Sequence, residues 1–314
     1  MTETTQTVFA QHQIRKTKKQ KSKFQAYVNE IATREGYDFR VEKGYLGAKN
    51  IVVGDPDSAK IVFSAHYDTC PRLLFPNFIT PKNIGLYLLY QVAVVLVFFF
   101  LPLALFSALA GILLGMLSIN HETILTICAL VEAFGWIGLL LLMLTGPANR
   151  HTANDNTSGV TALLDLMSSM PPEDRSRVAF VFFDLEEVGL FGSAGFAAKH
   201  KKSMQNKPLV NFDCVSDGNH ILFALRKNAS PFAKVLQEAF PSTEEFTTEV
   251  CSKGVFYPSD QYNFPCGIGV AALKQTKKRR LLYLDRIHTK HDTVYREENL
   301  RYLVEGSIRL TKLL

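Results

Sequence analysis

The sequence predicts an α/β fold: a mostly parallel central sheet covered by helices and interrupted by an inserted two-helix transmembrane hairpin. Three compact apolar runs, at 60–65, 178–184 and 210–212, are typical of strands buried on both faces of a parallel sheet. A helical pattern at 158–170 separates the first two runs, and this alternation of strand and helix indicates an α/β sheet. Residues 84–145 contain no Lys or Arg, which predicts the hairpin.

The composition is that of a globular protein. The 314 residues carry 35 basic and 29 acidic side chains, for a net charge of +6. The hydrophobic fraction of 47% argues against the disordered, collagen-like and coiled-coil classes. No aromatic-interleaved or helix-turn-helix pattern accompanies the basic charge, so we expect no nucleic-acid partner. The basic run at 274–280 is either a solvated loop or a site of attraction to anionic lipid.

Further elements lie on both sides of the insert. Phe24–Arg34 reads as an amphipathic helix, Asn50–Val53 as a strand and Gly54–Asp57 as a turn. The helix at Ser158–Met170 is stopped by two prolines. We divide the chain into a basic N-terminal tail (1–20), which we expect to be mobile, a first part of the soluble body (21–83), the hairpin (84–145) and a second part of the body (146–314).

The insert contains two apolar segments. Ile84–Ile119 has 36 residues without a charge, and Thr123–Thr145 has 23 residues with one charge, Glu132. A helix needs about 20 apolar residues to cross the bilayer core. Both ends of the insert join one body, so the number of crossings is even, and two crossings with a kink or tilt near Pro102 are the simplest arrangement. The alternative is a helical hairpin buried inside a soluble protein. Glu132 would make a helix–helix hydrogen bond or lie beside a water-filled gap.

The charges around the insert predict its orientation. Arg72, Lys82 and Arg150 flank the insert, whereas the turn Ser118–Glu122 has no basic residue. The positive-inside rule then places the soluble body in the cytoplasm. The N-terminus lacks the apolar run of a signal peptide, and five cysteines without CxxC spacing are expected to be reduced. We therefore expect an integral membrane protein with the lipid bilayer as a partner; the oligomeric state stays open.

Candidate metal ligands stand where the apolar runs end. Divalent metals need histidine and carboxylate ligands from several strand ends, and ligands of open α/β sheets bind at that edge. The candidates are His66, Asp68, Asp155, Glu186, Glu187, Asp213 and His288. Within this set His66 would be a ligand, and Asp68 would orient its ring. Adjacent carboxylates such as Glu186 and Glu187 can divide the work, one on metal and one on water.

Six segments resemble the M28 family of zinc-dependent aminopeptidases. They are SAHYDT (64–69), NDNTSGVTALLDL (154–166), FFDLEEVGLFGS (182–193), NFD (211–213), SDQYNF (259–264) and IHTKHDT (287–293). They run through most of the soluble body in family order, whereas the first 50 residues and the insert have no counterpart. The resemblance implies a zinc exopeptidase-like fold and two zinc ions.

The resemblance also implies a role for each ligand. One zinc would be held by His66, Asp155 and Asp213, and the other by Asp155, Glu187 and His288, so that Asp155 bridges. Glu186 would be the general base acting on a metal-bridged water. His291 competes with His288, but the family pattern places the ligand directly before Thr. Tyr257 either stabilises an oxyanion or is a packed surface tyrosine, and Asp260 is expected to support the site through hydrogen bonds.

These observations predict a membrane-anchored zinc aminopeptidase or related exopeptidase. The ends of the insert lie close in sequence to His66 and Asp155, so the zinc pair should lie near the membrane surface. Hydrophobic peptides would then be the preferred substrates. The alternatives are a glutaminyl cyclase-like acyltransferase, which needs one zinc, and a non-catalytic membrane scaffold on a peptidase fold.

Overall fold

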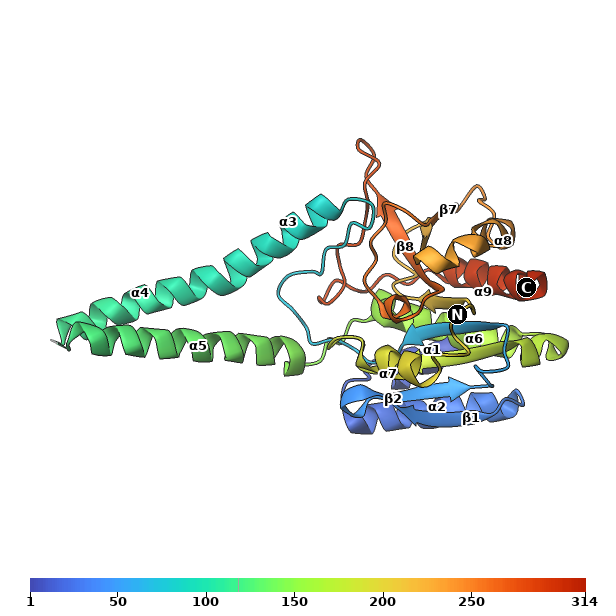
Figure 1. The fold of residues 1–314 in the computed structure, drawn as a ribbon, viewed down its shortest axis with the longest axis horizontal. Helices are drawn as coiled ribbons and strands as arrows, with labels where there is room; N and C mark the ends of the chain where they lie inside the picture. Colours follow the sequence, from blue (N-terminus) through green and yellow to red (C-terminus); the bar gives the residue numbers. More distant parts are fainter. Residues whose placement is uncertain (118) are drawn as a thin grey trace.

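The computed structural model describes residues 1–117 and 119–314, which form a body around a nine-stranded sheet and two long helices that project from it (Figure 1). The helices are α1 Glu3–Gln11, α2 Lys18–Arg34, α3 Ile84–Val95, α4 Leu101–Met116, α5 His121–Thr145, α6 Gly159–Ser169, α7 Phe191–Lys199, α8 Ala233–Ala239 and α9 Glu297–Leu313. The strands are β1 Phe39–Lys43, β2 Lys49–Val53, β3 Ile61–His66, β4 Val178–Phe183, β5 Leu209–Phe212, β6 His220–Leu225, β7 Thr247–Cys251, β8 Gly267–Gln275 and β9 Leu282–Tyr283. The four predicted strands correspond to β2, β3, β4 and β5, and the two predicted helices of the body to α2 and α6.

The sheet is mixed, so the prediction of a mostly parallel sheet is wrong. The strand order is β1-β2-β4-β3-β5-β8-β6-β7, with β9 paired to β8. Strands β4, β3, β5 and β8 run parallel, as do β6 and β7, whereas β1–β2, β2–β4, β6–β8 and β8–β9 are antiparallel. Residues 44–48 join β1 to β2, and residues 276–281 join β8 to β9. Parallel neighbours need a crossover of about a dozen residues or more, so these short connections form antiparallel hairpins.

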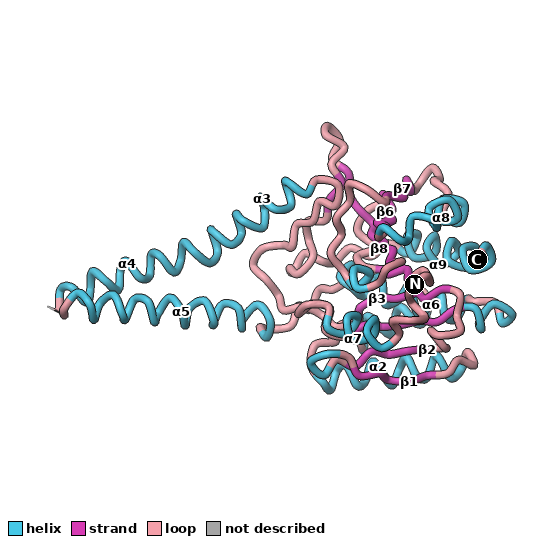
Figure 2. Tube along the Cα trace, viewed as in Figure 1, coloured by secondary structure: helices cyan, strands magenta, loops and turns pink. Residues whose placement is uncertain are grey.

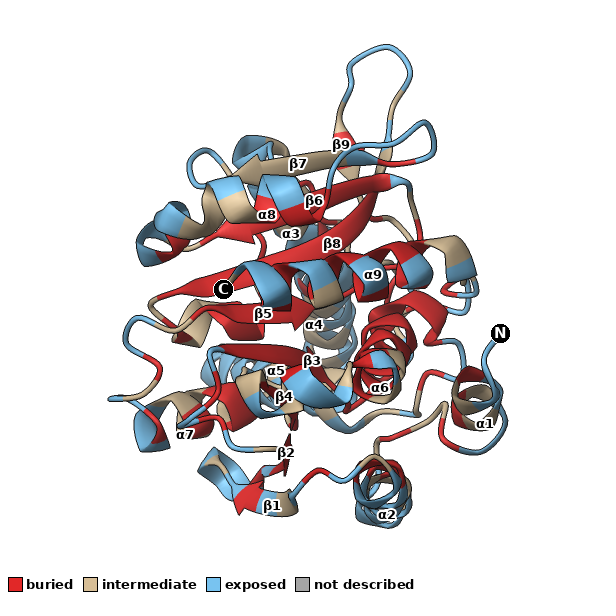
Figure 3. Ribbon diagram, turned by 90° about the vertical axis from the view of Figure 1, so that its right-hand side faces the viewer, coloured by how far each residue is buried: buried red, intermediate tan, exposed pale blue. Residues whose placement is uncertain are grey.

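Helices cover both faces of the sheet (Figure 3). On one face α2, α6 and α9 pack in a core that includes Phe63 and Phe180. On the other face Phe196 of α7 packs with Val62 and Val181. Successive strand residues point to opposite faces, so a strand covered on both sides is apolar throughout. This is why the central strands could be predicted as continuous apolar runs.

The N-terminal segment is packed against the body, which corrects the expectation of a mobile tail. Helix α1 lies against α6, and Val8 is buried. The Arg15 side chain is fully buried; its Nε donates to the Tyr67 carbonyl at 2.6 Å and its Nη1 to the His12 carbonyl at 2.6 Å. A guanidinium can be buried when its donors meet such acceptors. The expectation of a mobile tail rested on the basic composition of the segment, which does not show that these carbonyl acceptors are present.

The insert is a pair of long helices. Helices α3 and α4 are continuous through a π turn, η2 (Leu96–Phe100), and α5 returns beside α4 (Figure 2). The π turn lies just before Pro102, whose missing N–H removes a helical hydrogen bond. Both helices are long and apolar enough to cross a membrane, and almost none of their residues are buried in the protein. This exposure argues against a hairpin buried in a soluble body.

Two predictions about the insert concern its turn and the side chain of Glu132. Of the predicted turn Ser118–Glu122, Ser118 lies outside the described residues. Glu132 is exposed on α5. Its side chain makes no hydrogen bond to another described residue, so the first of the two alternatives, a helix–helix hydrogen bond, is not observed among these residues. The side-chain hydrogen bond seen between the helices runs instead from Cys128 Sγ to the Ser107 carbonyl at 3.5 Å.

Candidate metal centre

Three strand ends meet at one edge of the sheet. His66 is the last residue of β3, Asp213 follows β5 directly, and Glu186 and Glu187 lie just beyond β4. Because β4, β3 and β5 are parallel neighbours, their carboxyl ends lie side by side. This edge is where ligands of α/β sheets bind.

The carboxylate of Asp155, in the segment before α6, lies between two histidines. Its Oδ1 is 3.3 Å from His66 Nε2, and its Oδ2 is 3.1 Å from Nε2 of His288, which lies between β9 and α9. Asp213 Oδ1 is 3.6 Å from His66 Nε2, and Glu187 Oε2 is 3.2 Å from His288 Nε2. The structure therefore brings the five predicted ligands together in two groups that share Asp155.

The backbone turns sharply beside three of these residues. Leu185, before Glu186, has φ of 57°, Cys214, after Asp213, has 58°, and His288 itself has 65°. Left-handed backbone is uncommon for residues other than glycine and costs about 1–3 kcal/mol, so it persists where surrounding contacts hold it. These turns direct the side chains at the strand ends into one space.

Asp68 holds the end of β4. Its Oδ1 accepts the Glu186 N–H at 3.1 Å and its Oδ2 accepts the Glu187 N–H at 3.3 Å. The expected contact with the His66 ring comes mainly from the Asp68 backbone carbonyl, 3.2 Å from Nδ1, while the carboxylate is 3.7 Å away. Asp68 thus positions two carboxylates as well as one imidazole.

Asp292 is a site residue that sequence reasoning missed. Its carboxylate accepts the N–H of Asn154 at 2.8 Å and the N–H of Asp155 at 2.9 Å. Burial, with the nearby Asp155 charge, raises the pKa of Asp292 to about 8. Its position four residues after His288, inside the same motif, is the signal that could have identified it.

The surroundings shift the pKa values of two carboxyl groups of the site in opposite directions. Burial raises the pKa of Glu186 well above its usual value; His66 opposes this and Asp213 adds to it. Burial alone would also raise the pKa of Asp155, but hydrogen bonds from His288 and His66 hold that pKa well below its usual value. Carboxyl groups whose surroundings separate their pKa values in this way are typical of acid–base sites.

The cluster fits divalent metal ions. Within it, one ligand atom each of His66, Asp155 and Asp213 lies within 4.8 Å of the others. Glu187 Oε1 is buried without a hydrogen-bond partner among the described residues, as an oxygen reserved for a cation would be. Imidazole and carboxylate donors are those that zinc accepts. The thiol of Cys70, which was not predicted as a site residue, also lies near Glu187 and His288.

A cavity of about 250 Å³ opens beside the cluster. Tyr257 lines it and is buried rather than at the surface; its hydroxyl donates to the Asp213 carbonyl at 2.9 Å. Asp260 is fully buried, but neither carboxylate oxygen has a hydrogen-bond partner in the described chain, so its expected support through hydrogen bonds is not observed. Burial raises its pKa to about 7. His291 is exposed, and the structure brings His288 into the cluster instead.

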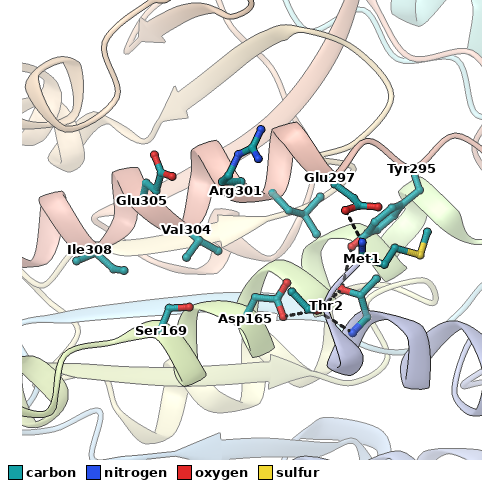
Figure 4. Close-up of a pocket in the computed structure, with 12 residues that line it drawn as sticks. Met1, Thr2, Asp165, Ser169, Tyr295, Glu297, Arg301, Val304, Glu305 and Ile308 are labelled. Carbon is teal, nitrogen blue, oxygen red and sulfur yellow. Dashed lines mark hydrogen bonds and ion pairs between the residues drawn. The ribbon is translucent and has the colours of Figure 1, made fainter.

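A larger cavity, about 530 Å³, lies between α1, α6 and α9 (Figure 4). It shares no lining residue with the cavity beside the cluster, and no histidine or cysteine lines it. The N-terminal ammonium forms an ion pair with Glu297 there, and Thr2 donates to Asp165 at 2.9 Å. The candidate metal ligands therefore face the smaller cavity.

Comparisons with known proteins agree with this geometry. The chain resembles the crystal structures of the LapA aminopeptidase of Legionella pneumophila (TM-score 0.56, 13% identity, 99% of this chain and 67% of that one) and of a Zn-dependent exopeptidase from Parabacteroides distasonis (0.55, 14%, 98% and 97%). It resembles a glutaminyl cyclase from Porphyromonas gingivalis equally well (0.57, 12%, 98% and 98%). At these identities the likeness shows a shared fold. No curated protein sequence matches significantly. The model of peptidase family M28 matches residues 138–302, more than half of the chain, and the chain therefore belongs to peptidase family M28.

Proposed function

We propose that the protein is a membrane-anchored zinc aminopeptidase, or a related exopeptidase, with two zinc ions. The observation that carries this is the Asp155 carboxylate, whose two oxygens face two different histidines. His66 and Asp213 would complete one zinc site, and His288 and Glu187 the other. Bound zinc supplies a water of lowered pKa and polarises the scissile carbonyl.

Glu186 is the proposed proton carrier. It lines the cavity, and no histidine among the described residues forms an ion pair with its carboxylate, in contrast to Glu187. The Glu186 carboxylate would accept the proton of the attacking water and deliver it to the nitrogen of the leaving amine. Asp68 fixes the Glu186 backbone and so orients the base.

Removal of metal is expected to abolish peptide hydrolysis, and added zinc is expected to restore it. The assay uses purified protein, a chelator and short peptides with free or blocked N-termini. An aminopeptidase cleaves the free peptides only. Cyclisation of N-terminal glutamine by protein with one zinc would indicate the cyclase reaction that the fold also accommodates, and absence of bound zinc and of turnover would indicate a scaffold.

We also propose that α3–α4 and α5 cross the bilayer, with the body in the cytoplasm. Their length, apolar composition and exposure support this, as do the flanking residues Arg72, Lys82 and Arg150. A tag inserted at Asn120 is then expected to be labelled from outside intact cells, while external protease spares the body. Labelling of the tag only after lysis would contradict two crossings.

The site is proposed to prefer hydrophobic peptides, because the hairpin joins the body close to the cavity. Asn149, four residues after the hairpin, donates to the carbonyl of Thr289 at 3.0 Å, next to His288. Substrates that partition into lipid would be concentrated at such a site. The comparison is kcat/KM for apolar and polar peptides of equal length, with the intact protein in bilayers and with residues 84–145 replaced by a soluble linker. An unchanged ratio in a linker variant that folds and binds zinc would mean that the hairpin is only a tether.

A further inference from the structure

The loop that leads into the hairpin forms a wall of the metal-site cavity. Asn77 and Ile79, both before α3, line the cavity together with the ligands. The loop is paired with the segment that carries His288: the Leu73 N–H donates to the His288 carbonyl at 2.8 Å and the Asn77 N–H to the Ile287 carbonyl at 3.3 Å. Residues of the loop that leads into the hairpin therefore line the space proposed for the substrate.

The other side of this loop is held by the apolar helix. The Tyr90 hydroxyl of α3 donates to the Pro76 carbonyl at 2.6 Å, and the Tyr90 ring lies 5.3 Å from that of Phe78. The rings of Phe75 and Phe98 lie 4.5 Å apart. Helix α3 and the π turn that follows it thus hold the loop from Phe75 to Phe78.

One polar contact sets the orientation of Asn77. Gln91, a polar residue in an otherwise apolar helix, donates from Nε2 to Asn77 Oδ1 at 3.3 Å. The amide oxygen of Asn77 accepts from the helix, and its Nδ2 group makes no hydrogen bond to another described residue. Since Asn77 also lines the cavity, its Nδ2 group is available as a donor to a ligand bound there. A polar residue within an apolar, membrane-spanning helix is costly and commonly serves a functional contact.

We propose that Asn77 is a substrate-binding residue that donates from Nδ2 to a backbone carbonyl oxygen of the bound peptide, and that Gln91 is a positioning residue that acts through it. The helix pair then shapes the substrate site as well as carrying the body. This inference rests on the proposed peptidase function, since it takes a peptide as the ligand.

The test measures binding of trileucine by calorimetry to the full-length, zinc-loaded protein in detergent. A Glu186→Gln background keeps the peptide intact during the measurement. Asn77→Ala is expected to raise the Kd about tenfold, and Gln91→Leu about threefold. In the double variant Gln91→Leu adds nothing to Asn77→Ala, because Gln91 acts only through Asn77. Leu89→Ala, at an exposed position of the same helix, is the matched control and leaves the Kd unchanged.

Asn77→Asp distinguishes loss of the Nδ2 donor from a folding defect, because it preserves the size of the side chain and the acceptor for Gln91. It replaces the donor by an oxygen and is expected to weaken binding at least as much as Asn77→Ala, with zinc content unchanged. In the protein with Glu186 intact, Asn77→Ala should raise KM with little change in kcat. The inference is wrong if the parent protein does not bind trileucine, if both Asn77 variants bind it normally, or if Gln91→Leu weakens binding equally with and without Asn77. These Kd changes in the Glu186→Gln background, together with no cleavage of trileucine by the protein with Glu186 intact, would refute the peptidase function and leave the Asn77 assignment standing.

Discussion

Replacing Glu186 by glutamine is expected to lower turnover about 100-fold or more while leaving the zinc content unchanged. Glutamine has the size of glutamate but cannot accept a proton from water. Glu186 makes no ion pair with either histidine of the site, and its backbone is held by Asp68, so the amide should occupy the same place. The measurement is kcat for a free-N-terminus peptide together with zinc content by elemental analysis.

Glu187→Gln is the matched control. The Glu187 carboxylate lies 3.2 Å from His288 Nε2, and its second oxygen is buried without a hydrogen-bond partner in the part of the chain that the structure describes, which is typical of a metal ligand. This variant is therefore expected to lose zinc as well as activity. The opposite pattern, zinc lost from Glu186→Gln and kept by Glu187→Gln, would mean that the roles of the two residues are reversed.

Asp155→Ala is expected to remove both zinc ions and all measurable activity. Its two oxygens lie 3.3 Å and 3.1 Å from His66 and His288, so one truncation takes a ligand from each group. Loss of the shared carboxylate also takes an ion-pair partner from both His66 and His288. Zinc content after dialysis and the Tm of the metal-loaded protein give the two readouts.

Asp213→Ala separates this effect from general damage to the cluster. Asp213 faces His66 alone, at 3.6 Å, so its truncation should weaken one zinc site and spare the other. Two zinc ions retained by Asp155→Ala would contradict the bridging assignment. Equal loss of zinc from both variants would show that the two sites fill only together.

The sequence was most informative at buried strands that lead into candidate metal ligands. Strands β3, β4 and β5 are covered on both faces, so each is a continuous apolar run, and each ends at or a few residues before a side chain of the cluster. His66 and Asp213 could be predicted for this reason. The ligand role of His288 had a weaker basis, because its segment has no regular structure and depended on the family motif.

Features that depend on tertiary partners could not be predicted. Strand β1 has only one buried residue, Glu42, and therefore carries no apolar signal. The burial of Arg15 depends on carbonyl groups of Tyr67 and His12, whose positions follow from the completed fold. Asp292 supports the site through backbone N–H groups, which leave no trace in the side-chain pattern.

The position of β3 in the sheet sets the order in which this protein can be made. β3 pairs with β4 and β5, and both are encoded after the hairpin. At ribosomal speeds of about 5–20 residues per second, roughly 7 to 30 s separate the synthesis of His66 from that of Asp213. Until β4 has been made, β3 has none of its strand partners and β2 has an unpaired edge. The nascent chain must therefore be kept from pairing with other chains until its second half emerges, and the metal centre closes only when His288 has left the ribosome.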